Sequence, residues 1–91
     1  MDNMRYKADL EWILTLALKE REPLLSQVLI SDDGEFAIVQ VAAKCTRRKL
    51  TPIGKEFIHT GVVGKWFSGE GEKTYLQNFW RLVLEDAELP C

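Results

Sequence analysis

The fold class depends on residues 24–44, LLSQVLISDDGEFAIVQVAAK. Asp33 and Gly34 stand between two runs that contain β-branched residues, which is a strong short-range signal for a hairpin turn. On this interpretation the segment forms a β-hairpin over about residues 26–43, and the chain is an α+β protein.

The same letters also favour helices. Asp32 with Glu35 three residues later fits a capping box, and the alanines and Gln40 that follow are good helix formers. Periodicity does not decide between the two structures, because residues 36–43 are apolar on every side except at Gln40. We therefore predict two helices here, and with them a mainly α protein of five to six short helices around one core. The hairpin stays as the alternative.

Helical periodicity predicts two amphipathic helices outside this segment, at residues 5–22 and 74–88. The apolar stripe of the first helix consists of Tyr6, Leu10, Ile13, Leu14, Ala17 and Leu18. The apolar stripe of the second helix consists of Tyr75, Leu76, Phe79, Trp80, Val83 and Ala87. Trp12 and Leu16 lie off the first stripe, so they belong either to a wide buried face or to an exposed ridge that binds a partner.

A shorter helix is predicted at residues 52–60. Thr51 can accept a hydrogen bond from an unpaired N–H at its start, and Pro52 loses no hydrogen bond at the first helical position. Gly61 tolerates the positive φ at which such a helix ends. Residues 62–67 are then expected to form a second short helix or a strand of similar length.

The composition is that of one small globular domain. The chain has 91 residues, of which 46% are hydrophobic and 29% charged, enough for a single modest core. No apolar run approaches the ~20 residues that cross a bilayer, and the charged N-terminus is unlike a signal peptide. We expect a cytoplasmic protein with no membrane partner.

The two cysteines, Cys45 and Cys91, are too few for the disulfide framework of a small secreted domain. Cys91 is also the last residue, where chain ends fray. We expect both to be free thiols. One histidine and two distant cysteines do not supply the ligands of a structural zinc site.

No catalytic motif is found in the sequence. His59 and Cys45 are the sole histidine and an internal cysteine, and their spacing does not indicate a nucleophile with its base. Neighbouring acids in glycine-containing turns are typical of solvated loops, and no phosphate-binding glycine motif occurs. We predict that the protein is not an enzyme and has no cofactor.

Positive charge is concentrated between residues 44 and 66. The six basic residues of this segment are Lys44, Arg47, Arg48, Lys49, Lys55 and Lys65. They stand against the single acid Glu56, which gives +5, while six basic and thirteen acidic residues elsewhere give −7, for the total of −2. We expect these cations, carried on a loop and two short helices, to share one exposed surface opposite the acids.

Part of the chain resembles a known DNA-binding family. The segment TPIGKEFIHTGVVGKWFSGE followed by KTYLQNFWRLVLED is similar to the second, third and fourth helices of phage-repressor-type helix-turn-helix domains, over about residues 49–86. This resemblance implies a small transcription regulator of helix-turn-helix type that binds duplex DNA.

Our leading hypothesis is therefore a nucleic-acid-binding regulator, because clustered cations next to helix N-termini are what phosphate contacts need. Its candidate binding residues are Lys44, Arg47, Arg48, Lys49, Lys55, Thr60 and Lys65. The alternative is a protein–protein interaction module, such as an adaptor or a phage-encoded inhibitor, that docks on an acidic surface of a larger protein or forms a homodimer. Its candidate partner-binding residues are Trp12, Trp66 and Phe67.

Overall fold

The structure is a computed structural model that describes residues 4–61 and 72–91, apart from the side chains of 72–77. Within these residues the elements in chain order are α1 (Lys7–Lys19), β1 (Leu25–Ile30), β2 (Phe36–Val41), β3 (Lys44–Lys49), α2 (Pro52–Thr60), α3 (Glu72–Val83) and β4 (Leu89–Pro90). The protein is thus α+β, and the prediction of a mainly α fold is wrong. The element predicted at residues 62–67 lies outside the described residues.

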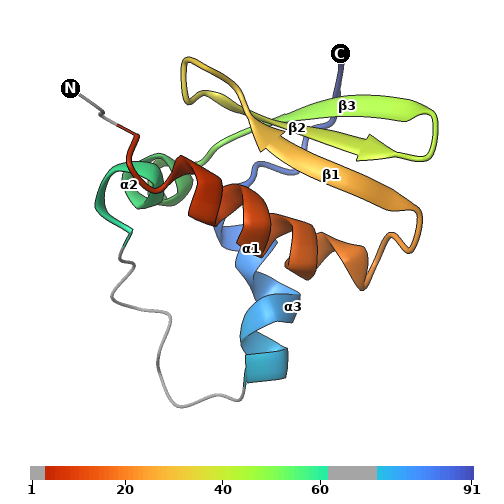
Figure 1. The fold of residues 1–91 in the computed structure, drawn as a ribbon, viewed down its shortest axis with the longest axis horizontal. Helices are drawn as coiled ribbons and strands as arrows, with labels where there is room; N and C mark the ends of the chain where they lie inside the picture. The colour runs from red at the N-terminus through yellow and green to blue at the C-terminus, as the bar shows by residue number, and fades with distance from the viewer. Residues whose placement is uncertain (1–3, 62–71) are drawn as a thin grey trace.

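The four strands form one antiparallel sheet in the order β1-β2-β3-β4. Figure 1 shows α1, α2 and α3 below this sheet, and none of the described helices lies on its upper face. Helix α1 packs against β1, α2 and α3, so it lies at the centre of the helical layer. We call the face of the sheet toward the helices the inner face and the opposite one the outer face.

The two-helix prediction for residues 24–44 is wrong, and the hairpin alternative is confirmed. Val28 pairs with Val39 and Ile30 with Ala37, and all four of these side chains are buried on the inner face. Strand pairing therefore buries alternate residues of β1 and β2 against the helical layer. Tertiary packing of this kind overrides the local helix propensity of the alanines.

The turn between β1 and β2 uses its acids differently from a capping box. The Oδ1 atom of Asp33 accepts hydrogen bonds from the hydroxyl of Ser31 at 2.6 Å and from the backbone N–H of Glu35 at 3.0 Å. The hydroxyl of Ser31 in turn accepts from the N–H of Phe36. These two donors, Ser31 first, hold the pKa of the Asp33 carboxyl below its usual range. The acids thus brace a hairpin turn.

The basic run KCTRRK is strand β3, not the loop that was expected. Val41 pairs with Lys44, so Ala42 and Ala43 alone connect β2 to β3. Ala42 has a φ of 53°, in the left-handed region where two-residue hairpins usually place Gly, Asn or Asp. No turn residue marks this hairpin in the sequence, so the third strand was missed.

The three predicted helices at residues 5–22, 52–60 and 74–88 are confirmed, although α1 and α3 end earlier than expected. Helix α2 has the predicted ends. The Thr51 hydroxyl accepts from the N–H of Gly54 at 3.2 Å, and Gly61, with a φ of 69°, donates its N–H to the carbonyl of Phe57. Ala87, predicted at the end of the last helix, lies beyond α3 and is exposed.

The end of β3 is joined directly to the end of α3. Leu50 and Leu84 form an isolated antiparallel bridge and are both buried. The Thr51 N–H donates to the Val83 carbonyl at 2.9 Å, and the Glu85 N–H donates to the Lys49 carbonyl at 2.8 Å. We call these two paired segments, residues 49–51 and 83–85, the junction. It ties the sheet to α2 and α3 at one point.

Gly54 explains how closely α2 approaches the junction. A glycine inside a helix costs about 1 kcal/mol relative to alanine. Here, however, a Cβ atom on residue 54 would lie 2.6 Å from the Val83 carbonyl oxygen and 3.2 Å from the Val83 Cβ. The absence of a side chain therefore allows α2 to pack on α3.

We expect Gly54→Ala to lower the free energy of unfolding by about 1–2 kcal/mol, because the cost of overpacking against backbone exceeds the gain in helix propensity. Chemical denaturation of the purified protein measures this. Glu56→Ala, at an exposed position of the same helix, is the control and should change stability by less than about 0.5 kcal/mol. A stabilised Gly54→Ala variant would contradict the close packing of α2 on α3.

Candidate functional site: three surfaces and a disulfide

The basic residues of β3 are divided between the two faces of the sheet. Arg48 pairs with Ala37, which is fully buried, so Arg48 lies on the inner face. Arg47 pairs with Ile38 on the outer face, and Lys49 lies on the outer face as well. The alternation of side chains along a strand causes this division.

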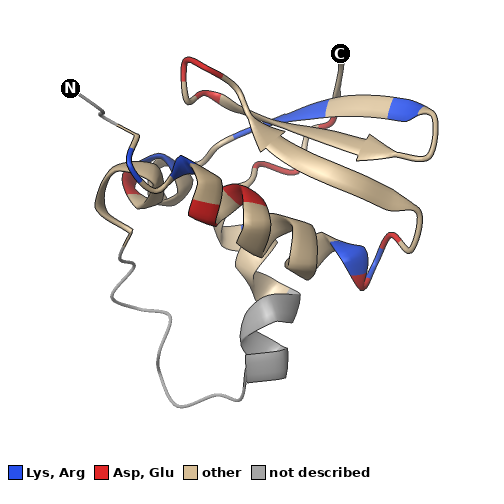
Figure 2. Ribbon diagram, viewed as in Figure 1, with Lys and Arg blue, Asp and Glu red and all other residues tan. Residues whose placement is uncertain are grey.

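The other candidate residues for nucleic-acid binding that the structure describes do not join Arg47 and Lys49 in one continuous surface. Lys44 is exposed at the start of β3, while Lys55 on α2 forms an ion pair with Glu35 at 2.9 Å. Thr60 donates its hydroxyl to the carbonyl of Glu56 at 3.0 Å. Lys65 lies outside the described residues. Figure 2 shows acidic and basic segments interleaved over the described residues, so among these the basic residues do not gather on one surface opposite the acids, as was expected.

The outer face carries a row of side chains that crosses all four strands. By the strand register this row is Leu29, Ile38, Arg47 and Leu89. Leu29 and Leu89 are 43% and 38% exposed, and the Arg47 guanidinium lies 4.6 Å from the centre of the Phe36 ring. This surface cannot be predicted from the sequence, because it requires β3 and β4, which carry no strand signal of their own.

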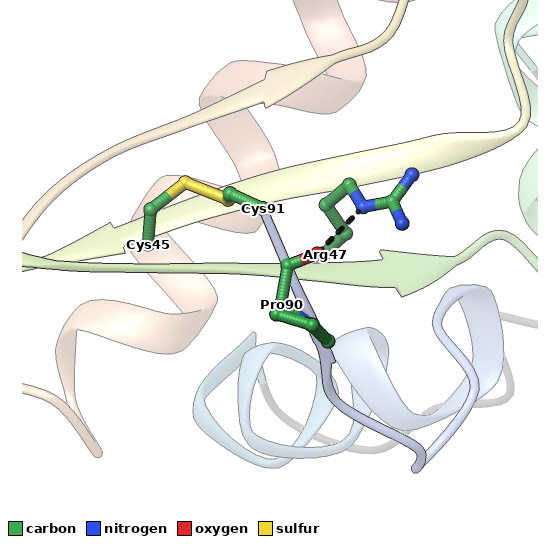
Figure 3. The surroundings of a disulfide bond; sticks show 4 residues. All are labelled: Cys45, Arg47, Pro90 and Cys91. Carbon is green, nitrogen blue, oxygen red and sulfur yellow. Dashed lines mark hydrogen bonds between the residues drawn. A yellow bond between two sulfur atoms is a disulfide. The ribbon is translucent and has the colours of Figure 1, made fainter.

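Cys45 and Cys91 form a disulfide, so the prediction of two free thiols is wrong. Their Cα atoms are 5.7 Å apart although 46 positions separate them in the sequence. The register of β3 with β4 explains this, because Thr46 pairs with Pro90 and the next residues on either side are the two cysteines. Figure 3 shows the bond beside Arg47, whose Nε–H donates to the Pro90 carbonyl at 3.1 Å.

The disulfide also decides whether Cys45 and His59 can act as a catalytic nucleophile and its general base. Cys45 is bonded to Cys91 and has no thiolate in this state, and His59 is an exposed residue in the last turn of α2. The two residues therefore do not form a nucleophile with its base here.

Helix α1 presents an apolar ridge to solvent. Trp12 is 66% exposed and Leu16, one turn further on, is 39% exposed. The opposite side of the same helix supplies buried Leu10, Leu14 and Leu18 to the core. Of the candidate partner-binding residues, Trp12 is thus at the surface, whereas Trp66 and Phe67 lie outside the described residues. We call Trp12 and Leu16 the α1 ridge.

No protein-family model matches the chain, and neither a curated protein nor a solved structure is found to be similar to it. In the part of the chain that the structure describes, no helix is both long and apolar enough to cross a membrane. No group of three His, Cys, Asp or Glu side chains in that part could hold a metal ion. Inference about function therefore rests on the surfaces themselves.

We expect the disulfide to contribute about 2–4 kcal/mol to the free energy of unfolding, because it closes a long loop in the unfolded chain. Denaturation with and without a reductant measures this contribution. The double variant Cys45→Ser with Cys91→Ser is the control, and its stability should not respond to the reductant. Finding two free thiols by mass spectrometry of the oxidised protein would refute the pairing.

Proposed function

We propose that this protein is a small protein–protein interaction module that docks through the α1 ridge, and that it has no enzymatic activity. The exposed indole of Trp12 carries the proposal. A tryptophan side chain has an area of ~200 Å², so burying the exposed two thirds is worth roughly 3 kcal/mol at ~25 cal/mol per Å². The folded monomer does not bury this side chain, so the free energy is available for binding a partner.

The position of the ridge supports a docking role over a packing role. Helix α1 already fills the core with the side chains of its inner stripe, so removing Trp12 would leave no cavity. Tryptophan is among the residues most enriched where a few side chains dominate binding energy, and Leu16 extends the apolar contact by one helical turn. An acidic partner surface, a homodimer and a cytoplasmic location, all predicted from the sequence, stay predictions.

Nucleic-acid binding is the second candidate function, and one observation favours it. Arg47 and Lys49 lie together on the outer face beside the Phe36 ring, and neither makes a salt bridge within the described residues. Cations next to an aromatic ring on an open face of a sheet suit phosphate and base contacts. The resemblance of residues 49–86 to helix-turn-helix domains stays a prediction, since its central helix falls on residues that the structure does not describe.

The docking proposal is tested by placing a photo-crosslinking amino acid at position 12 in cells that produce the protein. We expect position 12 to capture one protein that position 24 does not, since Leu24 is equally exposed but lies off the ridge. With the captured protein purified, Trp12→Ala should weaken binding about 30-fold, and Leu24→Ala by less than about twofold.

Both variants should keep the melting temperature of the parent, because neither side chain is in the core. Identical crosslinking from positions 12 and 24, or an unchanged affinity of Trp12→Ala, would count against the α1 ridge.

The nucleic-acid candidate is tested by fluorescence anisotropy with labelled duplex DNA at several salt concentrations. If Lys49 contacts a phosphate, Lys49→Ala should reduce the slope of log affinity against log salt by about 0.9. Lys19→Ala removes an equally exposed lysine from α1 and should leave the slope unchanged. An absence of binding even at low salt would eliminate this function.

A further inference from the structure

A cavity of about 300 Å³ lies between the inner face of the sheet and the helices. Its apolar wall comes from Leu18 of α1 and from Val39 and Val41 of β2. Its polar wall includes Arg48 of β3 and Trp80 of α3. The cavity is on the other side of the sheet from Arg47, and it does not include the α1 ridge.

Two buried donors in this wall have no hydrogen-bond partner among the described residues. They are the Nε atom of Arg48 and the Nε1 atom of Trp80. Trp80 is 6% exposed and the Arg48 side chain 15% exposed, so both side chains are largely withdrawn from bulk water. Buried polar groups in folded proteins are nearly always paired, and leaving them unpaired costs free energy. Both groups belong to side chains that line the cavity, so they are candidates to pair with an acceptor bound in it.

The other contacts of Arg48 are long. Its Nη2 atom lies 3.9 Å from a carboxylate oxygen of Glu88 and 3.5 Å from the Asp86 carbonyl. The Glu88 side chain is 53% exposed, so its carboxylate is largely solvated and its ion pair with Arg48 is weak. An incoming acceptor can take its place on the guanidinium without breaking a short hydrogen bond.

Positive charge surrounds the indole of Trp80. The guanidinium carbon of Arg48 lies 5.0 Å from the ring centre and that of Arg21 lies 4.8 Å from it. Both arginines line the cavity together with Lys44, against Glu22 and Glu88, which leaves the lining with one net positive charge. An arginine and an indole N–H are donors with no acceptor atom, so their complement is a hydrogen-bond acceptor, and the net positive charge of the lining favours an anionic one.

We propose that this cavity binds a small organic carboxylate with an apolar body. A planar carboxylate matches the donor fork of a guanidinium, and a single negative charge balances the lining. A phosphate dianion would bring a second negative charge close to Glu22 and Glu88. The side chains of Leu18, Val39 and Val41 would contact an alkyl or aromatic body, as in pockets that are mostly apolar with few placed polar groups.

Nuclear magnetic resonance of the whole protein tests this with 4-methylpentanoate and its uncharged isostere 4-methylpentanamide. The carboxylate should move the Trp80 Nε1–H resonance, assigned by its loss in Trp80→Phe, and should bind at least about tenfold more tightly than the amide. Equal binding of the two probes, or an unmoved Trp80 resonance, would overturn the proposal. This comparison uses the unaltered protein, so it does not depend on any variant folding.

Two adjacent arginines provide a matched pair of variants. Arg48→Lys keeps the charge but loses the donor fork and should weaken 4-methylpentanoate binding about tenfold or more. Arg47→Lys alters the next residue of β3, on the outer face, and should leave the affinity unchanged. Equal weakening by both variants would show a general charge effect and refute the site.

Two further probes separate the sources of the carboxylate. An acetylated dipeptide that ends in leucine tests for the C-terminal carboxylate of a peptide, and its tighter binding would make the ligand a chain end. If 4-methylpentanoate binds more tightly than the dipeptide, the ligand is a free organic acid. Inorganic phosphate that moves the Trp80 resonance at a lower concentration than either probe would contradict the apolar requirement.

Discussion

The junction between residues 49–51 and 83–85 determines how the rest of the molecule is arranged. Its backbone hydrogen bonds and the buried pair Leu50 and Leu84 join the last residue of the basic strand to the last turn of α3. They fix α3 so that Trp80 lies beneath Arg48. They also send the chain after α3 back along β3, where it becomes β4. The positions of the cavity and of the disulfide both depend on the junction.

The outer face of the sheet and the α1 ridge are separate surfaces, carried by different elements. In the described part of the chain, helices cover one face of the sheet only (Figure 1). Arg47 and its apolar neighbours lie on the other face. Helix α1 has one apolar side in the core and a second one, with Trp12, in water. A domain this small cannot bury both sides of its elements. These two uncovered surfaces are the candidate docking site and the candidate nucleic-acid site.

The division of the basic run shows why charge in a sequence does not give charge on a surface. Consecutive cations in a strand point alternately to the two faces, so Arg47 and Arg48 have different surroundings. Arg48 packs on an indole and Arg47 on a phenyl ring. The same residues on a loop could have converged on one partner. The described cations of this run therefore do not form the single basic surface that was expected.

The sequence alone determined the features that depend on neighbouring residues. The start of α2 at Thr51, its end at Gly61 and the apolar stripes of α1 and α3 follow from local hydrogen bonding and helical periodicity. The tertiary structure alone decided the rest. The choice of strand for residues 24–44 rests on burial against α1, and β3 begins after a turn of two alanines that no turn residue marks. The disulfide, the cavity and the outer row of side chains join residues that are far apart in the sequence, as far as Leu18 and Glu88 of the cavity lining. Contacts at that distance along the chain leave no periodic or spacing signal, because it is packing that brings them together.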